Sequence, residues 1–330
     1  MNQVLPEEGL KQTNKIQITL KCHNDQDEKE ICKKNLRLVV PEEKKLKIQI
    51  KLKNHESEQD IEEPILHGLA ITITYSECVE NHVKMQQLGQ ISDQGFTLDD
   101  LMAAKEQFEK VGVNCQLHYL NEALSLTDRE TTIADDAYVL IVRNAVDALL
   151  KDCDQNKQTM MSELTSFAWD TQALMRKKVV NKHARHNVCF SEVDQEPDIP
   201  NGQGTVISFE RVACPNWIRS KLPQFLGNKA EQLLAEGNKY NDVAVNGIGA
   251  HGDTERKKVI GVRLGQSFPL HYQWFLRFKP VGERIKLMLH DGDMYVMSQK
   301  AVGHDWKKSS LLTLRHAAGA NKYLIMKSNE

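Results

Sequence analysis

Long apolar runs are missing from the sequence: none approaches the roughly 20 residues that a membrane-spanning helix needs. The opening residues, MNQVLPEEGLKQTNK, have no apolar core of the kind found in a signal peptide, so we expect no targeting segment there. The seven cysteines are scattered and form no C-x-x-C pair, which argues against a disulfide framework and against a cysteine zinc site. We therefore expect a protein of a reducing compartment, the cytoplasm or the nucleus, with no membrane partner.

An excess of one charge is also lacking. The 43 Lys and Arg residues nearly balance the 45 Asp and Glu residues, so only a local patch could attract nucleic acid. The stretch GNKAEQLLAEGNK has neither G-x-G-x-x-G nor Walker spacing, which excludes the common nucleotide-binding loops there. What is present, 40% hydrophobic and 27% charged residues over 330 positions, is typical of a globular protein with two or three domains.

Hydrophobic periodicity divides the chain into three predicted regions. Residues 1–85 contain four short alternating segments and predict a β-rich N-terminal domain: KIQITLKC, NLRLVV, LKIQIKLKN and LAITITYSE. Residues 86–174 alternate helix and strand signals and predict a small α/β region. Its first helix, TLDDLMAAKEQFEKVG, has Thr97 as its N-cap and Gly112 as its stop.

The third region, residues 175–330, is predicted to contain one clear helix followed by many strands. The helix IRSKLPQFLGNKAEQLLAEG is expected to end at Gly237. Strand candidates then follow in quick succession: KKVIGVRL, PLHYQWFLRF, ERIKLMLH, DMYVMSQ, SLLTLRHA and NKYLIMK. Short strands without intervening helices indicate a barrel or jelly roll, so the predicted fold class is α+β with flanking helices.

A histidine and an aspartate lie two positions apart just before these strands. His251 and Asp253 would project from one face of an extended segment, where imidazole and carboxylate can hold adjacent positions of an octahedral metal. A second histidine from a distant strand completes a 2-His-1-carboxylate triad, which suits non-haem Fe(II). Gly249 and Gly252 allow the backbone to approach closely beside the pair. Alone, H-x-D equally fits a turn histidine beside a capping aspartate.

The order of motifs around this pair resembles the Fe(II)/2-oxoglutarate-dependent dioxygenases, and within them the AlkB-like branch. NKYNDVAVNGIGAHGDTE looks like the Asn-x-Tyr…His-x-Asp segment of that branch, DGDMYVMSQ like its Gly-Asp strand, and LTLRHAAG like its closing strand. The resemblance covers the chain from about residue 175 and implies a C-terminal double-stranded β-helix, a jelly roll. It also implies Fe(II) and 2-oxoglutarate as cofactors, with Asn238 and Tyr240 in the positions that contact the cosubstrate.

Two candidates exist for the third metal ligand. His304 comes 51 residues after Asp253, where the family usually has its distal histidine, and Arg315 then follows by 11 residues as the carboxylate-binding arginine. If SLLTLRHA is instead the seventh strand and NKYLIMK the eighth, His316 is the ligand and Lys327 the carboxylate partner. This second assignment uses every strand candidate and is preferred. Neighbouring residues of a strand face opposite ways, so Arg315 and His316 cannot both point into one pocket.

The closing strand also departs from the family pattern. AlkB-like proteins usually end with two arginines six positions apart, but Ser309 lies six positions before Arg315 and Asn321 lies six after it. A single basic residue can still hold a distal carboxylate by a charge-assisted pair. The substrate that the pocket accepts stays open.

A basic cluster precedes the predicted barrel, where AlkB-like enzymes have a lid over the substrate. Its residues could contact phosphates, or they form an ordinary solvated face: Arg176, Lys177, Lys178, Lys182 and Arg185. The resemblance implies that 2-oxoglutarate is decarboxylated to succinate while a C–H bond is hydroxylated, and that a hydroxylated N-methyl group leaves as formaldehyde. The predicted function is oxidative demethylation or hydroxylation of a nucleic-acid base, single-stranded or flipped. Two alternatives are the same chemistry on a protein or small molecule, and a binding module without turnover.

Overall fold

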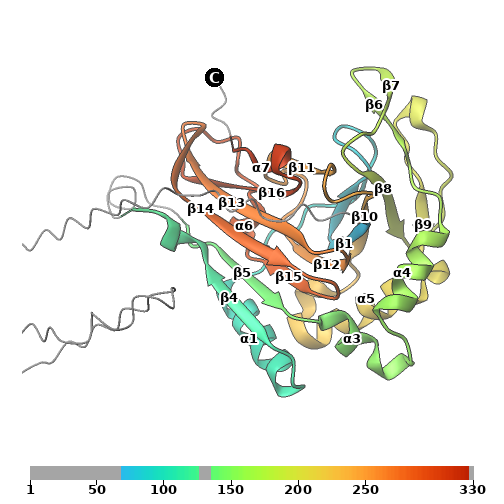
Figure 1. The fold of residues 1–330 in the computed structure, drawn as a ribbon, viewed down its shortest axis with the longest axis horizontal. Coiled ribbons are helices and arrows are strands. Elements are labelled where there is room, and N and C mark those ends of the chain that lie inside the picture. Colours follow the sequence, from blue (N-terminus) through green and yellow to red (C-terminus); the bar gives the residue numbers. More distant parts are fainter. Residues whose placement is uncertain (1–67, 126–134, 327–330) are drawn as a thin grey trace, which may run out of the picture. The chain divides into compact units, whose positions relative to one another are not determined.

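The computed structural model describes residues 68–125 and 135–326, which all belong to one compact unit, Glu62–Glu330. Its largest element is an eight-stranded sheet with the strand order β4-β5-β15-β12-β1-β10-β8-β9 (Figure 1). In that order the strands are Cys115–Tyr119, Tyr138–Val142, Met294–Met297, Val259–Gly265, Ala70–Ser76, Leu234–Tyr240, His186–Ser191 and Val206–Ser208. Neighbouring strands are antiparallel except β8 and β9, which are parallel.

A second, four-stranded antiparallel sheet has the order β11-β16-β13-β14. Its strands are Gly247–His251, Thr313–Gly319, Phe268–Leu276 and Lys279–Leu289. Two hairpins stand apart from these sheets: β2 (Cys78–Glu80) with β3 (Gln87–Gly89), and β6 (Gln172–Met175) with β7 (Lys178–Asn181). The α-helices among the described residues are α1 (Leu98–Lys110), α3 (Ala145–Leu150), α4 (Lys157–Ser166), α5 (Ala213–Leu226), α6 (Gln299–Val302) and α7 (Asn321–Leu324).

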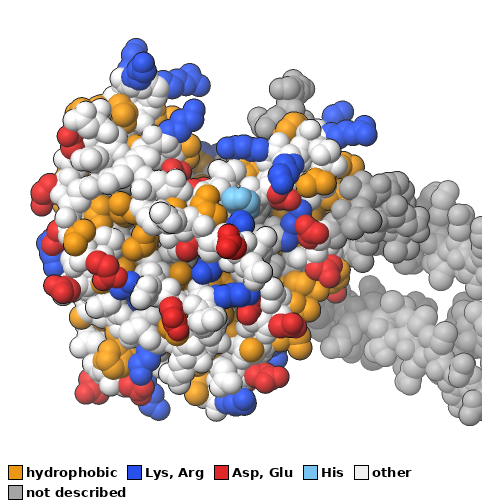
Figure 2. Space-filling view, turned by 180° about the vertical axis from the view of Figure 1, so that it is seen from behind, with side chains coloured by type: hydrophobic (Ala, Val, Ile, Leu, Met, Phe, Trp, Pro, Cys, Tyr) orange, Lys and Arg blue, Asp and Glu red, His pale blue; other side chains and the backbone are white. Residues whose placement is uncertain are grey.

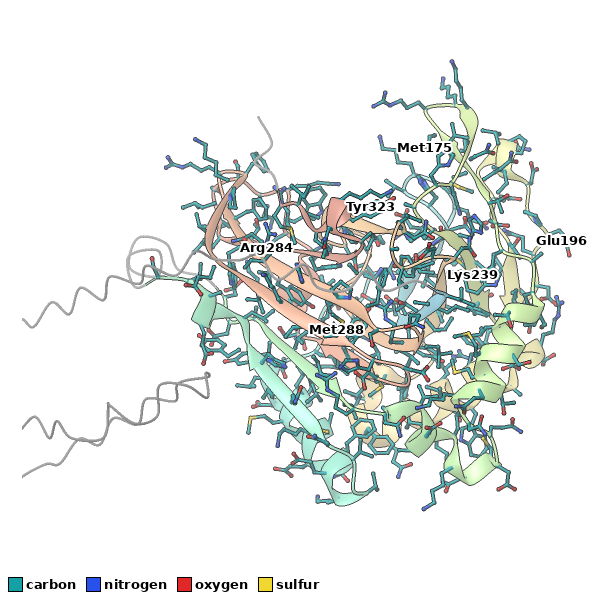
Figure 3. The ribbon with its side chains drawn as sticks, in the orientation of Figure 1. Met175, Glu196, Lys239, Arg284, Met288 and Tyr323 are labelled. Atoms are coloured by element: carbon teal, nitrogen blue, oxygen red, sulfur yellow. The ribbon has the colours of Figure 1, made fainter. Side chains whose placement is uncertain are left out.

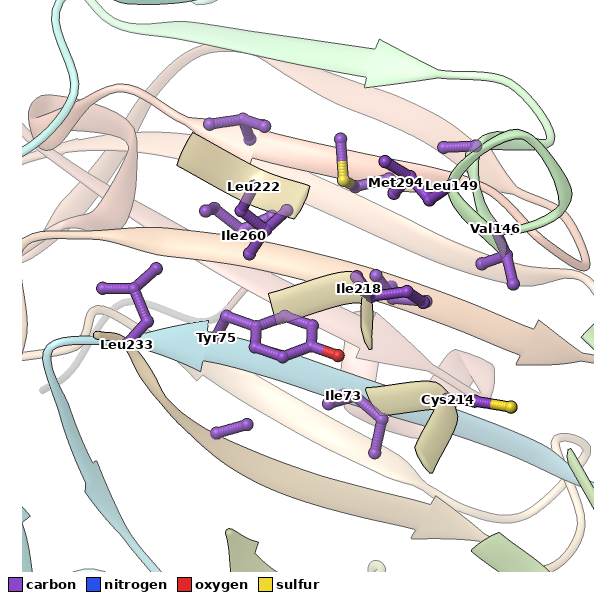
Figure 4. Close-up of a cluster of buried hydrophobic side chains, with 14 of the residues drawn as sticks. Ile73, Tyr75, Val146, Leu149, Cys214, Ile218, Leu222, Leu233, Ile260 and Met294 are labelled. Carbon is purple, nitrogen blue, oxygen red and sulfur yellow. The ribbon is translucent and has the colours of Figure 1, made fainter. Parts of the chain in front are cut away.

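The longer helices cover one face of the eight-stranded sheet. Figure 4 shows Ile73, Tyr75 and Ile260 of this sheet in one buried cluster with Ile218 and Leu222 of α5. Alternate residues of a strand point to one face, so a sheet of this pattern needs an apolar cover on that side. The helices supply it.

The opposite face of the eight-stranded sheet packs against the four-stranded sheet. Tyr240, Val259 and Tyr295 from the large sheet share a buried cluster with Tyr272 and Trp274 from the small one. The described residues therefore form three layers, of helices, large sheet and small sheet, and inward-facing side chains of both sheets meet in the middle (Figure 1).

The first predicted helix is confirmed, and the second is too long. Thr97 caps α1 by accepting a hydrogen bond from the Asp100 backbone N–H, and Gly112 follows the helix with a φ of +83°. The helix expected to reach Gly237 ends at Leu226 instead, because Gly227 adopts a φ of +69°. The residues LAEGNKY beyond it form β10, which pairs with β1 on one side and β8 on the other.

The prediction that NKYLIMK is a closing strand is wrong. Its first four residues form α7, after Gly319 has turned the chain with a φ of +114°. Leu324 and Met326 then pack with Phe275 on the outer face of the small sheet. Lys327 lies outside the described residues.

The coarse fold prediction agrees with the structure, which is a mixed α/β arrangement of one large sheet, smaller antiparallel sheets and few helices. The eight-stranded sheet draws strands from each of the predicted ranges 1–85, 86–174 and 175–330. LAITITYSE forms β1, whereas the other three predicted N-terminal strands lie outside the described residues. Within the described ranges, no helix has the length and apolarity needed to cross a bilayer.

Candidate metal centre

Two histidines and one aspartate come together at the edge of the small sheet. His251 ends β11, Asp253 follows it, and His316 lies on β16, directly opposite His251 in the strand register. One ligand atom from each of the three residues lies within 4.8 Å of the others. His251 Nε2 is 3.3 Å from Asp253 Oδ1, and His316 Nε2 is 3.9 Å from that same oxygen. Two imidazoles and one carboxylate so placed can share a single cation.

The backbone fixes the orientation of the His251 ring. Its Nδ1 lies 2.8 Å from the carbonyl oxygen of Gly249, so a proton on Nδ1 is donated to that carbonyl. The other nitrogen, Nε2, then carries the free lone pair and faces Asp253. Such an outer hydrogen bond is how metal-binding histidines are usually held in the ligating tautomer.

His316 is buried as a neutral ring. Burial, and to a smaller extent the neighbouring His251, lowers its pKa to about 3. Tyr272 and His251 enclose it, with ring centroids at 5.9 and 4.4 Å. A neutral imidazole is the form that donates a lone pair to a metal.

Asp253 is held ionised by a basic neighbour. Burial tends to raise its pKa, but the nearby charge of Arg256 is the largest of the effects that outweigh burial and keep the pKa well below the ordinary range. Arg256 is itself buried and pairs with Glu236 at 2.7 Å and with Glu255 at 2.9 Å. The Asp253 backbone N–H also donates to the carbonyl of Val302, which anchors the loop.

Of the two glycines expected to permit a close backbone approach, only Gly252 does so. A Cβ atom on Gly252 would lie 2.2 Å from the carbonyl oxygen of Gly303 and 2.8 Å from Trp306, whereas a Cβ on Gly249 would have nothing within 4 Å. The expectation for Gly249 is therefore wrong. Gly252 separates His251 from Asp253 in the chain, so its missing side chain lets both ligand candidates reach the same point.

The three residues open into a cavity of about 420 Å³ lined by side chains of both sheets. Asn238 and Tyr240, predicted from the Asn-x-Tyr motif, line it from β10. The side-chain oxygen of Asn238 accepts hydrogen bonds from Arg185 and from Asn187, and its amide group donates to Glu236. The motif residues and the metal candidates thus share one cavity.

The other sequence candidates lie elsewhere. His304 is in the turn after α6 and is not part of the group of described residues that could hold a metal. Arg315 lies on the face of β16 opposite to His316, with its guanidinium 3.9 Å from the ring centroid of Phe275 and 5.0 Å from that of Trp306. It is not among the residues that line the cavity, so its position does not fit the predicted contact with a cosubstrate there.

Sequence reasoning missed a different arginine. Arg263 on β12 lines the cavity and is buried, with only 2% of its surface exposed. The signal was present in VIGVRLG: a charged residue interrupts an apolar strand at the position that alternation assigns to the face shared with Val259 and Gly261. That face points toward the small sheet.

The predicted basic cluster divides into two parts. Arg176, Lys177 and Lys178 are exposed at the tip of the β6–β7 hairpin, whose turn has a positive φ at the first two of them. Figure 2 shows basic side chains gathered at this end of the molecule, at the upper left of the view. Lys182 is half-buried, donates to Asn81 at 2.6 Å, and has a pKa that burial lowers to about 8. Arg185 lines the cavity.

Comparison with known proteins gives one strong relative. No family model matches the chain. Over 254 residues the chain is 42% identical to a protein of Acanthamoeba polyphaga mimivirus named "Uncharacterized protein R156". The match covers 77% of this chain and 97% of the viral protein.

Proposed function

We propose that this chain, which belongs to the same family as the mimivirus protein R156, is an Fe(II)/2-oxoglutarate-dependent dioxygenase of the AlkB-like branch. The observation that carries the proposal is the grouping of His251, Asp253 and His316 around one point. A 2-His-1-carboxylate set leaves three of six positions open and is the typical protein ligand set of non-haem Fe(II) oxygenases. The residues present therefore fit the metal.

The architecture supports the same assignment. The four-stranded sheet faces part of the large sheet, and β11 and β16, which carry the histidines, are neighbours at its edge. We interpret the small sheet and the strands of the large sheet that face it, including β10, β1, β12 and β15, as a double-stranded β-helix, or jelly roll, extended by the outer strands of the large sheet.

The protein's own groups would act by binding and orienting. His251, Asp253 and His316 would hold the cation, while Asn238 and Tyr240 line the space where a 2-oxo acid would lie. When bound, Fe(II) supplies the activation of dioxygen; the overall reaction converts a C–H bond, O₂ and 2-oxoglutarate into C–OH, succinate and CO₂. Buried side chains of the two sheets would line this site and limit the access of water to it.

A nucleic-acid base is the proposed substrate, oxidised or demethylated at an N-methyl group. The support is the exposed basic tip of the β6–β7 hairpin, which offers three charges to phosphates. The hairpin belongs to the segment just before β8, and Arg185 at the end of that segment reaches the cavity. The described cysteines are free thiols, in keeping with the proposed reducing compartment, cytoplasm or nucleus.

Anaerobic titration tests the proposal. The full chain with Fe(II) should develop a metal-to-ligand charge-transfer band when 2-oxoglutarate is added, because the 2-oxo acid chelates an iron with open positions. His316→Ala should abolish the band. His304→Ala is the matched control and should retain it, since His304 is outside the triad. In air, the wild-type protein should also form succinate from 2-oxoglutarate.

The outcomes separate the alternatives. A missing band in the wild-type protein contradicts the dioxygenase assignment. A band without succinate, in the presence of methylated single strands, would favour the binding module that lost turnover. Succinate formation that methylated oligonucleotides do not stimulate would favour a protein or small-molecule substrate.

A further inference from the structure

Three arginine side chains line the cavity beside the metal candidates, and two of them already have partners. Arg256 pairs with Glu236 and Glu255, and Arg185 donates to the side-chain oxygen of Asn238. Arg263 differs, since its Nε and Nη1 atoms are buried and have no hydrogen-bond partner among the described residues. No carboxylate of those residues lies within ion-pair distance of it.

A buried guanidinium without an anion is an expensive arrangement. Arg263 has only 2% of its surface exposed, so water does not replace the missing partners. It is packed by aromatic rings, with the centroid of Phe268 at 4.5 Å and that of Tyr240 at 5.8 Å. Stacking stabilises the cation, but it satisfies none of the N–H donors. An anionic ligand in the cavity would satisfy them.

The residues beside Arg263 form a polar row across three strands. Thr72 on β1 is the register partner of Arg263 on β12 and of Asn238 on β10. All three line the cavity, and the hydroxyl of Thr72 is also buried without a hydrogen-bond partner. Two neighbouring groups that both lack partners mark the position of one ligand group that could bind both.

This polar row lines the same cavity as the metal candidates. Tyr295, which also lines the cavity, covers Gly261, two positions before Arg263: a Cβ atom on Gly261 would lie only 2.0 Å from the Tyr295 ring. One cavity therefore presents a cation site at one place and an unpaired guanidinium at another. The ligand that fits has two anionic ends, one on the metal and one on the arginine.

We infer that Arg263 on β12 binds the distal carboxylate of a metal-bound dicarboxylate, which in the proposed function is 2-oxoglutarate. This inference rests on that function. It moves the carboxylate-binding arginine, which we call the anchor, from the closing strand, where Arg315 was expected, to a strand of the opposite sheet. Arg315 stacks on Phe275, on the other face of β16. The N–H groups of a guanidinium form charge-assisted hydrogen bonds with a carboxylate, and the Thr72 hydroxyl can donate a further one.

Two 2-oxo acids of equal chain length test the anchor on the full-length protein. 2-Oxopentanoate has a methyl group in place of the distal carboxylate of 2-oxoglutarate, so the two differ only where Arg263 acts. Calorimetry with the Mn(II)-loaded protein should give a 2-oxoglutarate affinity about 10- to 100-fold higher than that for 2-oxopentanoate, the range for a charged hydrogen-bonded pair. Arg263→Met should remove this preference, and Arg263→Lys should restore part of it.

Arg315→Met is the matched control and should keep the preference. Mn(II) affinity should be unchanged in Arg263→Met, because that residue does not touch the metal candidates. Equal binding of the two acids by the wild-type protein, or loss of the preference in Arg315→Met only, overturns the anchor while leaving the metal centre in place. A wild-type protein that binds no metal overturns the proposed function and the anchor together. If Arg263→Met does not fold, two measurements still test the anchor: the wild-type protein should prefer 2-oxoglutarate over 2-oxopentanoate, and Arg263→Lys should show only part of that preference.

Discussion

At the scale of single residues, one glycine determines whether the metal candidates can meet. Gly252 lies between His251 and Asp253, and its Cα packs against the Gly303 backbone and beside Trp306. Any Cβ atom there would overlap a carbonyl oxygen, which cannot move as the end of a flexible side chain could. The geometry of the ligand pair thus depends on a residue that contributes no ligand.

Gly252→Ala should weaken metal binding and lower stability. The methyl group must displace the backbone at Gly303 or shift the two ligands, and overpacking of this kind costs about 1–3 kcal/mol. Mn(II) calorimetry and urea denaturation measure the two effects. Gly249→Ala is the control, since a Cβ there meets nothing within 4 Å. Equal behaviour of the two variants would contradict the steric argument.

Residue-level prediction found residues that the structure brings to one cavity. H-x-D was recognised from its spacing, because side chains two positions apart on an extended segment share a face, and the Asn-x-Tyr motif on the strand before it was recognised from the family resemblance. His316 was preferred over His304 for a reason that failed, namely that NKYLIMK would be a strand, yet the strand register brings His316 opposite His251. Arg263 was missed because its importance lies in lacking a partner, which sequence does not reveal.

At the scale of secondary structure, the β6–β7 hairpin is the element that would contact a phosphate backbone under the proposed function. Its turn residues have positive φ and hold three basic side chains at one exposed tip. In contrast, Lys182 and Arg185 further along the chain are partly buried and bonded to Asn81 and Asn238. The predicted cluster of five therefore reduces to three side chains that can reach a partner.

Replacing these three side chains should weaken binding to nucleic acid. The triple variant Arg176→Gln, Lys177→Gln and Lys178→Gln should bind a methylated single strand less tightly and with weaker salt dependence. Loss of three phosphate contacts lowers the slope of log K against log salt by about 2. Fluorescence anisotropy at several salt concentrations measures it.

The matched control removes one arginine and two lysines from β14. Lys279→Gln, Arg284→Gln and Lys286→Gln changes the net charge by the same amount, and these side chains are also exposed. Figure 3 shows Arg284 far across the view from Met175 at the base of the hairpin tip. If both triple variants lose affinity equally, attraction by overall charge explains the binding and the hairpin has no specific part in it.

At the scale of the whole molecule, the metal candidates connect distant parts of the chain. His251 and His316 are on neighbouring strands of the small sheet, but 65 residues separate them in sequence. The cavity beside them is completed by β10, β12 and β1 of the large sheet. A bound cation should therefore stabilise the native state without affecting an unfolded chain that cannot assemble the site.

Adding metal should raise the unfolding temperature. At a free Mn(II) concentration 100 times the dissociation constant, the gain is about 2.7 kcal/mol. For a unit of this size that corresponds to roughly 5–10 °C. Differential scanning calorimetry with Mn(II), and again after EDTA, checks it. The shift should reverse with EDTA and be absent in Asp253→Ala; a shift that persists in that variant would place the metal elsewhere.

The sequence by itself determined the local features of this protein: the capped helix at Thr97, most strands after residue 257, and the paired His251 and Asp253. These follow from interactions between residues close together in the chain, which periodicity and spacing record. Only the tertiary structure decided that LAEGNKY is a central strand, that His316 completes the triad, and that Arg263 faces the cavity without a partner. The reason is physical, because strand pairing and burial join residues far apart in sequence. The free energies of pairing and burial depend on which residues become neighbours in space, and local sequence patterns do not contain that information.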